Sequence, residues 1–272
     1  MKMKFIAVAA TAIFLSSGYL LIAQKPDSKE FRDAVSLYNH GMYERARTVF
    51  ENISAKTADP LAQGYSVLCA AKMKSEGYLS EVSAYEHDHP YSVMMPQIHY
   101  QCGLNLFDDN NFEAASSQFA SVTSDELFKN QVPEFLFKKA YCDFGKGDYA
   151  NALVGFSKVE SLPHSDYTAP ARYSIGYIYY SNKDFNQAYD WFSKSVKDSR
   201  FADVSNYYML ECRFMNKDYK YVVDNGTKLY NQVPEDRKPH LARIISESYL
   251  VLGDADSAKD YYEKNVNNKV NM

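Results

Sequence analysis

The chain has little glycine and little proline, and this scarcity excludes several classes of protein. It contains 11 Gly and nine Pro among 272 residues, too few for a linker-rich or disordered protein. It also has no excess of positive charge, because 30 Lys and Arg are outnumbered by 34 Asp and Glu. A net charge of −4 gives no attraction for a polyanion, so nucleic acids and acidic lipid surfaces are poor candidates for a partner.

The sequence also lacks the short motifs that mark common catalytic and nucleotide-binding sites. It contains no G-x-S-x-G elbow, no G-x-x-x-x-G-K-[ST] phosphate loop and no G-x-G-x-x-G fingerprint. Of the six histidines only His87 and His89 lie close together, and a closed metal site needs a third or fourth ligand that no nearby spacing supplies. We therefore predict no catalytic residue, no cofactor and no metal site. An enzyme or metal-binding protein built on a helical frame stays open as an alternative.

Long apolar runs are absent except at the N terminus. Residues 5–22 carry no charge and follow Lys2 and Lys4, which is the layout of a secretory signal peptide. Cleavage would leave Gln24 as the first residue of the mature chain. The alternative is an uncleaved anchor, because this run of 18 residues is at the lower limit for a membrane span.

The rest of the chain repeats one pattern of small and aromatic residues. In the clearest repeat, Ala140 and Ala152 are twelve residues apart, and Phe156 follows four residues later. Seven such repeats occur, with spacings of 36, 33, 37, 36, 34 and 36 residues. Their paired small or branched residues are Ala34 with Ala46, Ala70 with Val82, Gly103 with Ala115, Ala140 with Ala152, Gly176 with Ala188, Leu210 with Val222 and Ser246 with Ala258. In two repeats Glu86 and Gly226 stand where the aromatic residue belongs.

Pairs of short antiparallel helices explain this pattern. Two helices of about twelve residues can pack across a short turn, and a small residue on each facing surface lets them approach. The aromatic residue one turn later is expected to fill the gap toward the neighbouring repeat. Because a lone amphipathic hairpin cannot bury its apolar face, the repeats must stack. The alternative is an irregular helical bundle, which does not require a recurring period.

The pattern resembles the tetratricopeptide-repeat (TPR) family, in Gly147-Asp148-Tyr149-x-x-Ala152-x-x-x-Phe156 and in Ile175-Gly176-x-x-Tyr179-Tyr180. The resemblance covers about residues 29–266 and implies an all-α, right-handed superhelical solenoid of about seven helix-turn-helix repeats. The expected division is a signal peptide at 1–23, a leader at 24–28, the solenoid at 29–268 and a tail at 269–272. With a signal peptide, the slightly long repeats are similar to those of periplasmic TPR proteins of Gram-negative bacteria.

The four cysteines are predicted to be buried free thiols. An even count in an exported protein raises the question of disulfides. Cys69 and Cys102, however, fall at equivalent places on the first helices of adjacent repeats, and Cys142 and Cys212 match each other two repeats apart. Neighbouring helix axes lie about 8–10 Å apart, whereas a disulfide needs Cα atoms within roughly 7 Å.

A stripe of aromatic residues on the first helices points to a binding site. Phe137 and Tyr141 are four residues apart, and so are Tyr173 and Tyr177 and also Tyr100 and Leu104. This spacing places the two residues of each pair on one face of a helix. In the TPR family the corresponding stripe lines the concave groove where ligands lie. The predicted groove residues are Tyr100, Leu104, Phe137, Tyr141, Tyr173, Tyr177 and Tyr207.

The predicted groove is not aromatic along its whole length, and its rings have an alternative role. Glu211, Arg243 and Glu247 make its far end polar. The alternative role for the rings is to complete core packing between repeats, but tyrosine favours a groove because its ring covers apolar surface while its hydroxyl reaches water.

These features predict a non-enzymatic protein–protein interaction scaffold of the bacterial cell envelope, located in the periplasm or at the outer-membrane periphery. The expected partner is a protein or peptide segment with apolar or aromatic side chains, and self-association through the solenoid ends is a further option. No integral membrane span is expected once the signal peptide is removed. The chain is alternatively the N-terminal part of a larger envelope TPR protein, because no extra polar capping helix follows the last repeat.

Overall fold

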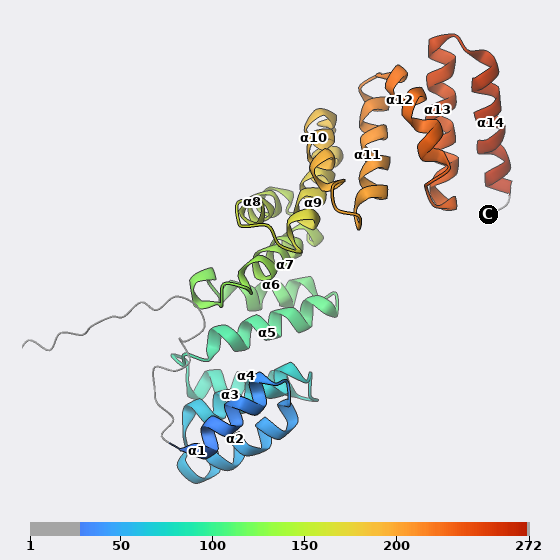
Figure 1. The fold of residues 1–272 in the computed structure, drawn as a ribbon. Helices are drawn as coiled ribbons and strands as arrows, with labels where there is room; N and C mark the ends of the chain where they lie inside the picture. Colours follow the sequence, from blue (N-terminus) through green and yellow to red (C-terminus); the bar gives the residue numbers. More distant parts are fainter. Residues whose placement is uncertain (1–27, 271–272) are drawn as a thin grey trace, which may run out of the picture. The chain divides into compact units, whose positions relative to one another are not determined.

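The computed structural model describes residues 28–270, with side chains described up to residue 266. The predicted signal peptide and residues 24–27 of the predicted leader lie outside the described residues. Within residues 28–270 the regular elements are fourteen α-helices and two short 3-10 turns, and no strand is formed (Figure 1). Over this part of the chain no helix is both long enough and apolar enough to cross a membrane.

The chain divides into two compact units, with the boundary between Val132 and Pro133. Unit 1 contains three helical hairpins, and each packs on the next through helix-to-helix contacts. Its helices are α1 (Lys29–Asn39), α2 (Tyr43–Thr57), α3 (Pro60–Lys72), α4 (Tyr78–Asp88), α5 (Met95–Asp108) and α6 (Phe112–Ala120), followed by the 3-10 turn Ser124–Glu126.

Unit 2 contains four hairpins. Its helices are α7 (Val132–Gly145), α8 (Tyr149–Glu160), α9 (Thr168–Ser181), α10 (Phe185–Ser195), α11 (Ala202–Met215), α12 (Tyr219–Tyr230), α13 (Lys238–Leu252) and α14 (Ala255–Val270), with the 3-10 turn Glu235–Arg237 before α13. Successive helices from α8 to α14 pack on one another, and Gly155 of α8 lies against Ala140 of α7. The all-helical repeat architecture expected from the sequence is therefore confirmed, with seven hairpins over the described residues.

The turn inside a hairpin follows from a short sequence pattern, a residue with positive φ followed by an aspartate. An aspartate precedes α8, α10 and α12, and its carboxylate accepts a hydrogen bond from the backbone N–H three residues later, which caps the helix. These aspartates are Asp148, Asp184 and Asp218. The residue before each has a positive φ, of 80° at Gly147 and 63° at Lys183 and Lys217. The chain therefore reverses direction and starts the next helix within a few residues.

The small residues allow rings to pack directly on the facing helix. A Cβ atom added to Gly103 would lie 2.4 Å from the ring of Phe119, and one added to Gly176 would lie 2.9 Å from the ring of Phe192. Both rings are fully buried. We expected these aromatics to fill the gap toward the neighbouring repeat, and each also packs on the facing helix of its own hairpin. Phe192 reaches the neighbouring repeat by stacking on Tyr208 of α11, with ring centroids 5.1 Å apart.

The two irregular repeats fill the same space in other ways. In the repeat with Glu86, the preceding Tyr85 is buried and lies where a Cβ on Gly64 would be. Its hydroxyl donates a hydrogen bond to the carbonyl of Pro60, at 2.9 Å. In the repeat with Gly226, the side chain of Ile245 from α13 occupies the space beside the glycine.

Enlarging a small residue at a hairpin contact is expected to destabilise unit 2. Ala188 of α10 is 0% exposed and packs in a cluster with Phe192. Ala188→Leu should therefore overpack the contact and lower the free energy of unfolding by about 1–3 kcal/mol. Thermal unfolding followed by circular dichroism measures the effect. An unchanged midpoint would show that position 188 does not lie at the helix contact.

Candidate partner-binding surface

Three first helices of unit 2 carry a continuous set of aromatic rings. Phe137, Tyr141 and Phe144 lie on α7, Tyr173, Tyr177 and Tyr180 lie on α9, and Tyr207 and Tyr208 lie on α11. We call these eight residues the aromatic surface. All eight are half-buried, so each ring both packs within the unit and keeps some contact with solvent.

The rings touch one another across the three helices. The contact chain runs from Phe137 through Tyr141 and Phe144 on α7, to Tyr177 on α9, and then to Tyr208 and Tyr207 on α11. Successive ring centroids are 5.9, 5.6, 5.8, 5.8 and 5.4 Å apart. Aromatic pairs at such distances attract each other by about 0.5–1.5 kcal/mol beyond simple burial. The helices therefore hold the rings as one ordered array.

The structure brings together five of the seven predicted groove residues. Phe137, Tyr141, Tyr173, Tyr177 and Tyr207 all belong to the aromatic surface of unit 2.

The other two lie on α5 of unit 1. Tyr100 is only 2% exposed and Leu104 is half-buried. A ring as buried as Tyr100 offers almost no surface to a partner, so the packing alternative describes this position better than the groove does.

A buried carboxylate lies at the α11 edge of the aromatic surface. Glu211 is only 5% exposed. Its oxygens accept hydrogen bonds from the Tyr180 hydroxyl at 2.7 Å and from Nδ1 of His240 on α13 at 2.8 Å. The Tyr207 hydroxyl lies 2.7 Å from Nδ1 of His240 and so joins the network through the imidazole. The network therefore connects α9, α11 and α13.

The neighbours of His240 fix its tautomer. Nη2 of Arg243 lies 2.9 Å from Nε2 of His240. A guanidinium can only donate hydrogen bonds, so Nε2 must accept and the proton must be on Nδ1, facing Glu211. Arg243 also donates to Glu247 at 2.7 Å.

The pKa values of this network follow from burial and hydrogen bonding. Burial alone would raise the pKa of Glu211, but the donors that surround the carboxylate, from His240, Tyr207 and Tyr180, outweigh it and the pKa is lowered. Burial raises the pKa values of Tyr180 and Tyr207, and the nearby Glu211 carboxylate raises them further. At neutral pH the site therefore contains a charged carboxylate and neutral phenols.

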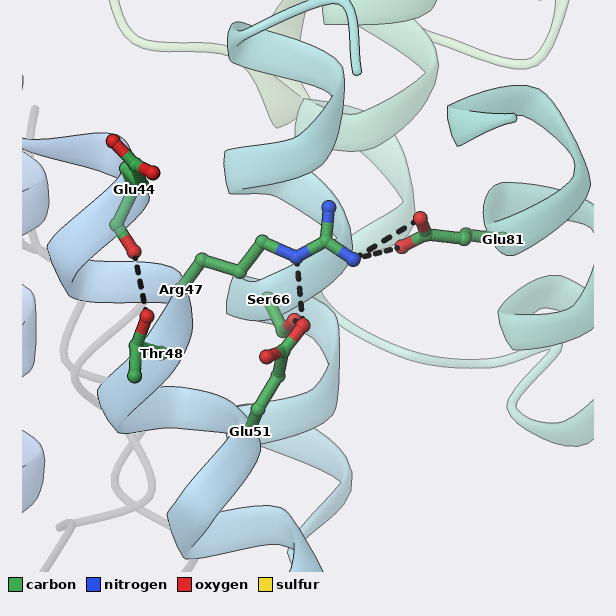
Figure 2. A network of polar contacts seen from close by, with 6 residues as sticks. All are labelled: Glu44, Arg47, Thr48, Glu51, Ser66 and Glu81. Atoms are coloured by element: carbon green, nitrogen blue, oxygen red, sulfur yellow. Dashed lines mark hydrogen bonds and ion pairs between the residues drawn. The ribbon is translucent and has the colours of Figure 1, made fainter. Parts of the chain in front are cut away.

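Unit 1 has a polar network of a different kind (Figure 2). Arg47 on α2 bonds to Glu51 one turn later at 2.7 Å, and its Nη2 reaches both carboxylate oxygens of Glu81 on α4 at 3.1 Å. Ser66 on α3 donates to Glu51 at 3.4 Å. The charged side chains are 24% to 51% exposed. We interpret this network as an ion-pair link between neighbouring hairpins.

The remaining candidate groups form no reactive site among the described residues. The four cysteines are buried and free, as predicted, and burial raises the pKa of each thiol to about 12. His89 hydrogen-bonds to Gln63 at 3.0 Å. Within residues 28–266 no three His, Cys, Asp or Glu side chains converge as metal ligands would.

Sequence reasoning missed four residues of this site. Phe144, Tyr180 and Tyr208 complete the aromatic surface, and His240 completes the network around Glu211. A signal for two of them was present, because an aromatic residue follows the first small residue by four positions at Phe107, Phe144, Tyr180 and Phe214. No comparable pattern marks His240, which lies 29 residues from Glu211.

Comparison with known sequences identifies one of the hairpins. Residues 169–197, which form most of α9 and α10, match the tetratricopeptide repeat family. Comparison with curated protein sequences gives no match.

Solved structures with the same architecture include three proteins of low sequence identity. The C-terminal part of a TPR repeat-containing protein from Cytophaga hutchinsonii is 16% identical with a TM-score of 0.60, covering 87% of this chain and 94% of that one. The apo form of RapI is 13% identical with a TM-score of 0.60, covering 90% and 76%. MamA from Desulfovibrio magneticus, from residue 41 to its end, is 16% identical with a TM-score of 0.55, covering 65% and 97%.

The hairpin architecture and these similarities place the chain among the all-α helical-repeat proteins. Within this fold, the hairpin of α9 and α10 matches the tetratricopeptide repeat, and the chain as a whole has the same helical-repeat fold as a solved TPR repeat-containing protein.

Proposed function

We propose that this chain is a non-enzymatic protein-interaction scaffold whose aromatic surface binds a partner segment with apolar or aromatic side chains. The observation that carries the proposal is the unbroken contact of half-buried rings across α7, α9 and α11. Aromatic side chains lose little conformational entropy on binding and provide most of the energy in many interfaces. An ordered array of such rings therefore suits a docking surface.

The chemistry of the surface changes along the unit. The α7 and α9 part presents mainly rings, whereas α13 presents His240, Arg243 and Glu247, all half-buried. A partner segment that follows the first helices would thus place apolar side chains over α7 and α9. Its hydrogen-bonding groups would lie over α13.

The contact between Glu211 and His240 has the form of an acid that orients a catalytic base. In such a pair the second imidazole nitrogen faces a nucleophile. Here Nε2 of His240 accepts a hydrogen bond from Arg243 instead. This arrangement favours a structural role for the pair within a scaffold.

The scaffold is tested by capture of partners from the native cell. The tagged chain is expressed there, and co-purified proteins are identified by mass spectrometry and then titrated against the pure chain. A variant with Tyr91→Ala is the control, because Tyr91 is 97% exposed on a loop of unit 1 and lies outside the aromatic surface. We expect a direct partner that binds the wild-type chain and the Tyr91→Ala variant with equal affinity. Recovery of no direct partner under native conditions would contradict it.

We also propose that the chain works in the bacterial cell envelope, in the periplasm or at the outer-membrane periphery. The support is the sequence of residues 1–24, in which Lys2 and Lys4 precede a long uncharged run.

The mature protein is expected to begin at or near Gln24. Intact-mass measurement of protein from the envelope fraction checks this expectation. Recovery of the full chain with Met1 in the membrane pellet would show that the N-terminal segment is kept as an anchor.

A further inference from the structure

Glu211 occupies a groove position that is apolar or aromatic in the repeats before it. It lies one residue after Leu210, the small-residue position of its repeat. The same place is filled by Leu104 in α5, Tyr141 in α7 and Tyr177 in α9. Burying a carboxylate is unfavourable unless hydrogen bonds compensate fully. An apolar side chain at position 211 would fill the space without that cost, so the carboxylate is expected to do something that packing alone does not require.

The hydrogen bonds of Glu211 act on the rings of the aromatic surface. Its carboxylate binds the hydroxyl of Tyr180 directly, and it holds the imidazole of His240, whose Nδ1 lies 2.7 Å from the hydroxyl of Tyr207. Both rings contact Tyr208, with centroids 5.1 and 5.4 Å away. Tyr208 in turn contacts Tyr177, at 5.8 Å. Fixing two hydroxyl ends therefore fixes the orientation of four rings.

His240 completes the set of donors around this carboxylate. Its Nδ1–H donates to Glu211, while Arg243 holds the opposite side of the imidazole. Each carboxylate oxygen thus has a donor, Tyr180 from α9 on one and His240 from α13 on the other. Charge-assisted hydrogen bonds are short and directional, so the network holds the hydroxyl ends more firmly than ring packing alone would.

We infer that Glu211 is a positioning residue, whose buried carboxylate holds Tyr180 directly and Tyr207 through His240. Through these two rings it also holds Tyr208 and Tyr177 in the arrangement that the partner meets. This inference rests on the proposed function of the aromatic surface. Its structural part, the fixing of the two hydroxyls, is tested without any partner.

The test is chemical nitration of tyrosine by tetranitromethane, with each site read by peptide mass spectrometry. The reagent attacks the phenolate, so a tyrosine whose hydroxyl is bound to a carboxylate reacts slowly. In Glu211→Gln the charge is lost while the shape is kept. Nitration of Tyr180 and Tyr207 should then accelerate about tenfold, the change in phenolate fraction that one pKa unit produces. Tyr91 provides the internal reference for a freely exposed ring.

Two controls separate positioning from general loosening of the fold. Glu247→Gln makes the same change of charge at the equivalent position of α13, where the glutamate is half-buried and pairs with Arg243. It should leave nitration of Tyr180 and Tyr207 unchanged. In Glu211→Gln, Tyr141 should also keep its wild-type rate, because it lies on α7. Unchanged rates at Tyr180 and Tyr207, or an equal rise at all half-buried tyrosines, would overturn the inference.

A second measurement needs no variant, in case Glu211→Gln does not fold. In the wild-type protein Tyr180 and Tyr207 should be nitrated more slowly than Tyr177, which is equally half-buried. Equal rates would contradict the role of Glu211. With a partner in hand, Glu211→Gln should also bind about tenfold more weakly. Faster nitration with unchanged binding would support the positioning of the rings and would count against the aromatic surface as the binding site.

Discussion

A chain carrying Tyr141→Ala together with Tyr177→Ala is expected to bind its partner about a thousandfold more weakly than the wild type. The two rings lie on α7 and α9, and both contact Phe144 between them. Aromatic anchors at the centre of an interface contribute roughly 2 kcal/mol or more each. Loss of two therefore corresponds to about 4 kcal/mol, or three orders of magnitude in the dissociation constant.

The same double variant should remain folded. Both side chains are half-buried, so their removal costs mainly the ring contacts, at about 0.5–1.5 kcal/mol each. Affinity is measured by titration with the purified partner, and folding by thermal circular dichroism on the same preparation. If the variant unfolds, the rings belong to the core. If it stays folded and binds with wild-type affinity, the partner docks elsewhere.

Phe192→Ala is expected to destabilise unit 2 by about 3–5 kcal/mol. The ring is 0% exposed, packs over Gly176 and stacks on Tyr208, so the truncation leaves a cavity between α9, α10 and α11. Urea unfolding followed by the fluorescence of Trp191, the single tryptophan of the chain, reports on this unit.

The last hairpin provides the matched control for this prediction. Tyr262 follows Ala258 by four residues, as Phe192 follows Ala188, but it is 60% exposed. Tyr262→Ala should therefore change the free energy of unfolding by no more than about 0.5 kcal/mol. Similar effects of the two substitutions would show that the burial of these rings does not determine how much each contributes to stability.

The hairpins could be predicted from the sequence because each uses the same local chemistry. Small residues twelve positions apart, such as Gly176 and Ala188, are the contact points of α9 and α10, and both are buried. The two residues before α10 are Lys183, which has a positive φ, and Asp184, which caps the helix. These signals act over a few residues, so a single sequence reveals them.

Packing between repeats was harder to predict, because several side chains could occupy the same space between two helices and the sequence does not show which of them does. Tyr85 rather than its neighbour fills the space in the irregular repeat, and Ile245 crosses from α13 to fill the space beside Gly226. Tyr100 has the periodicity of the predicted groove, yet it is buried. Periodicity gives the helix face on which a residue lies, but it does not give how much of that face its neighbours cover.

The polar network could not be predicted for a related reason. Glu211 and His240 come from different hairpins, and their pairing depends on the register between α11 and α13. The sequence indicated only that this end of the groove is polar. The burial of the carboxylate and its bonds to Tyr180 and His240 required the structure.

The most direct test of the proposed binding surface is site-specific photo-cross-linking. A photoreactive amino acid replaces either Tyr177 on α9, within the aromatic surface, or Val154 on α8, which is 57% exposed and outside it. The chain is then irradiated with its partner, and the covalent adducts are mapped. A binding site on the aromatic surface predicts an adduct from position 177 and none from position 154. An adduct from position 154 with none from position 177 would contradict it.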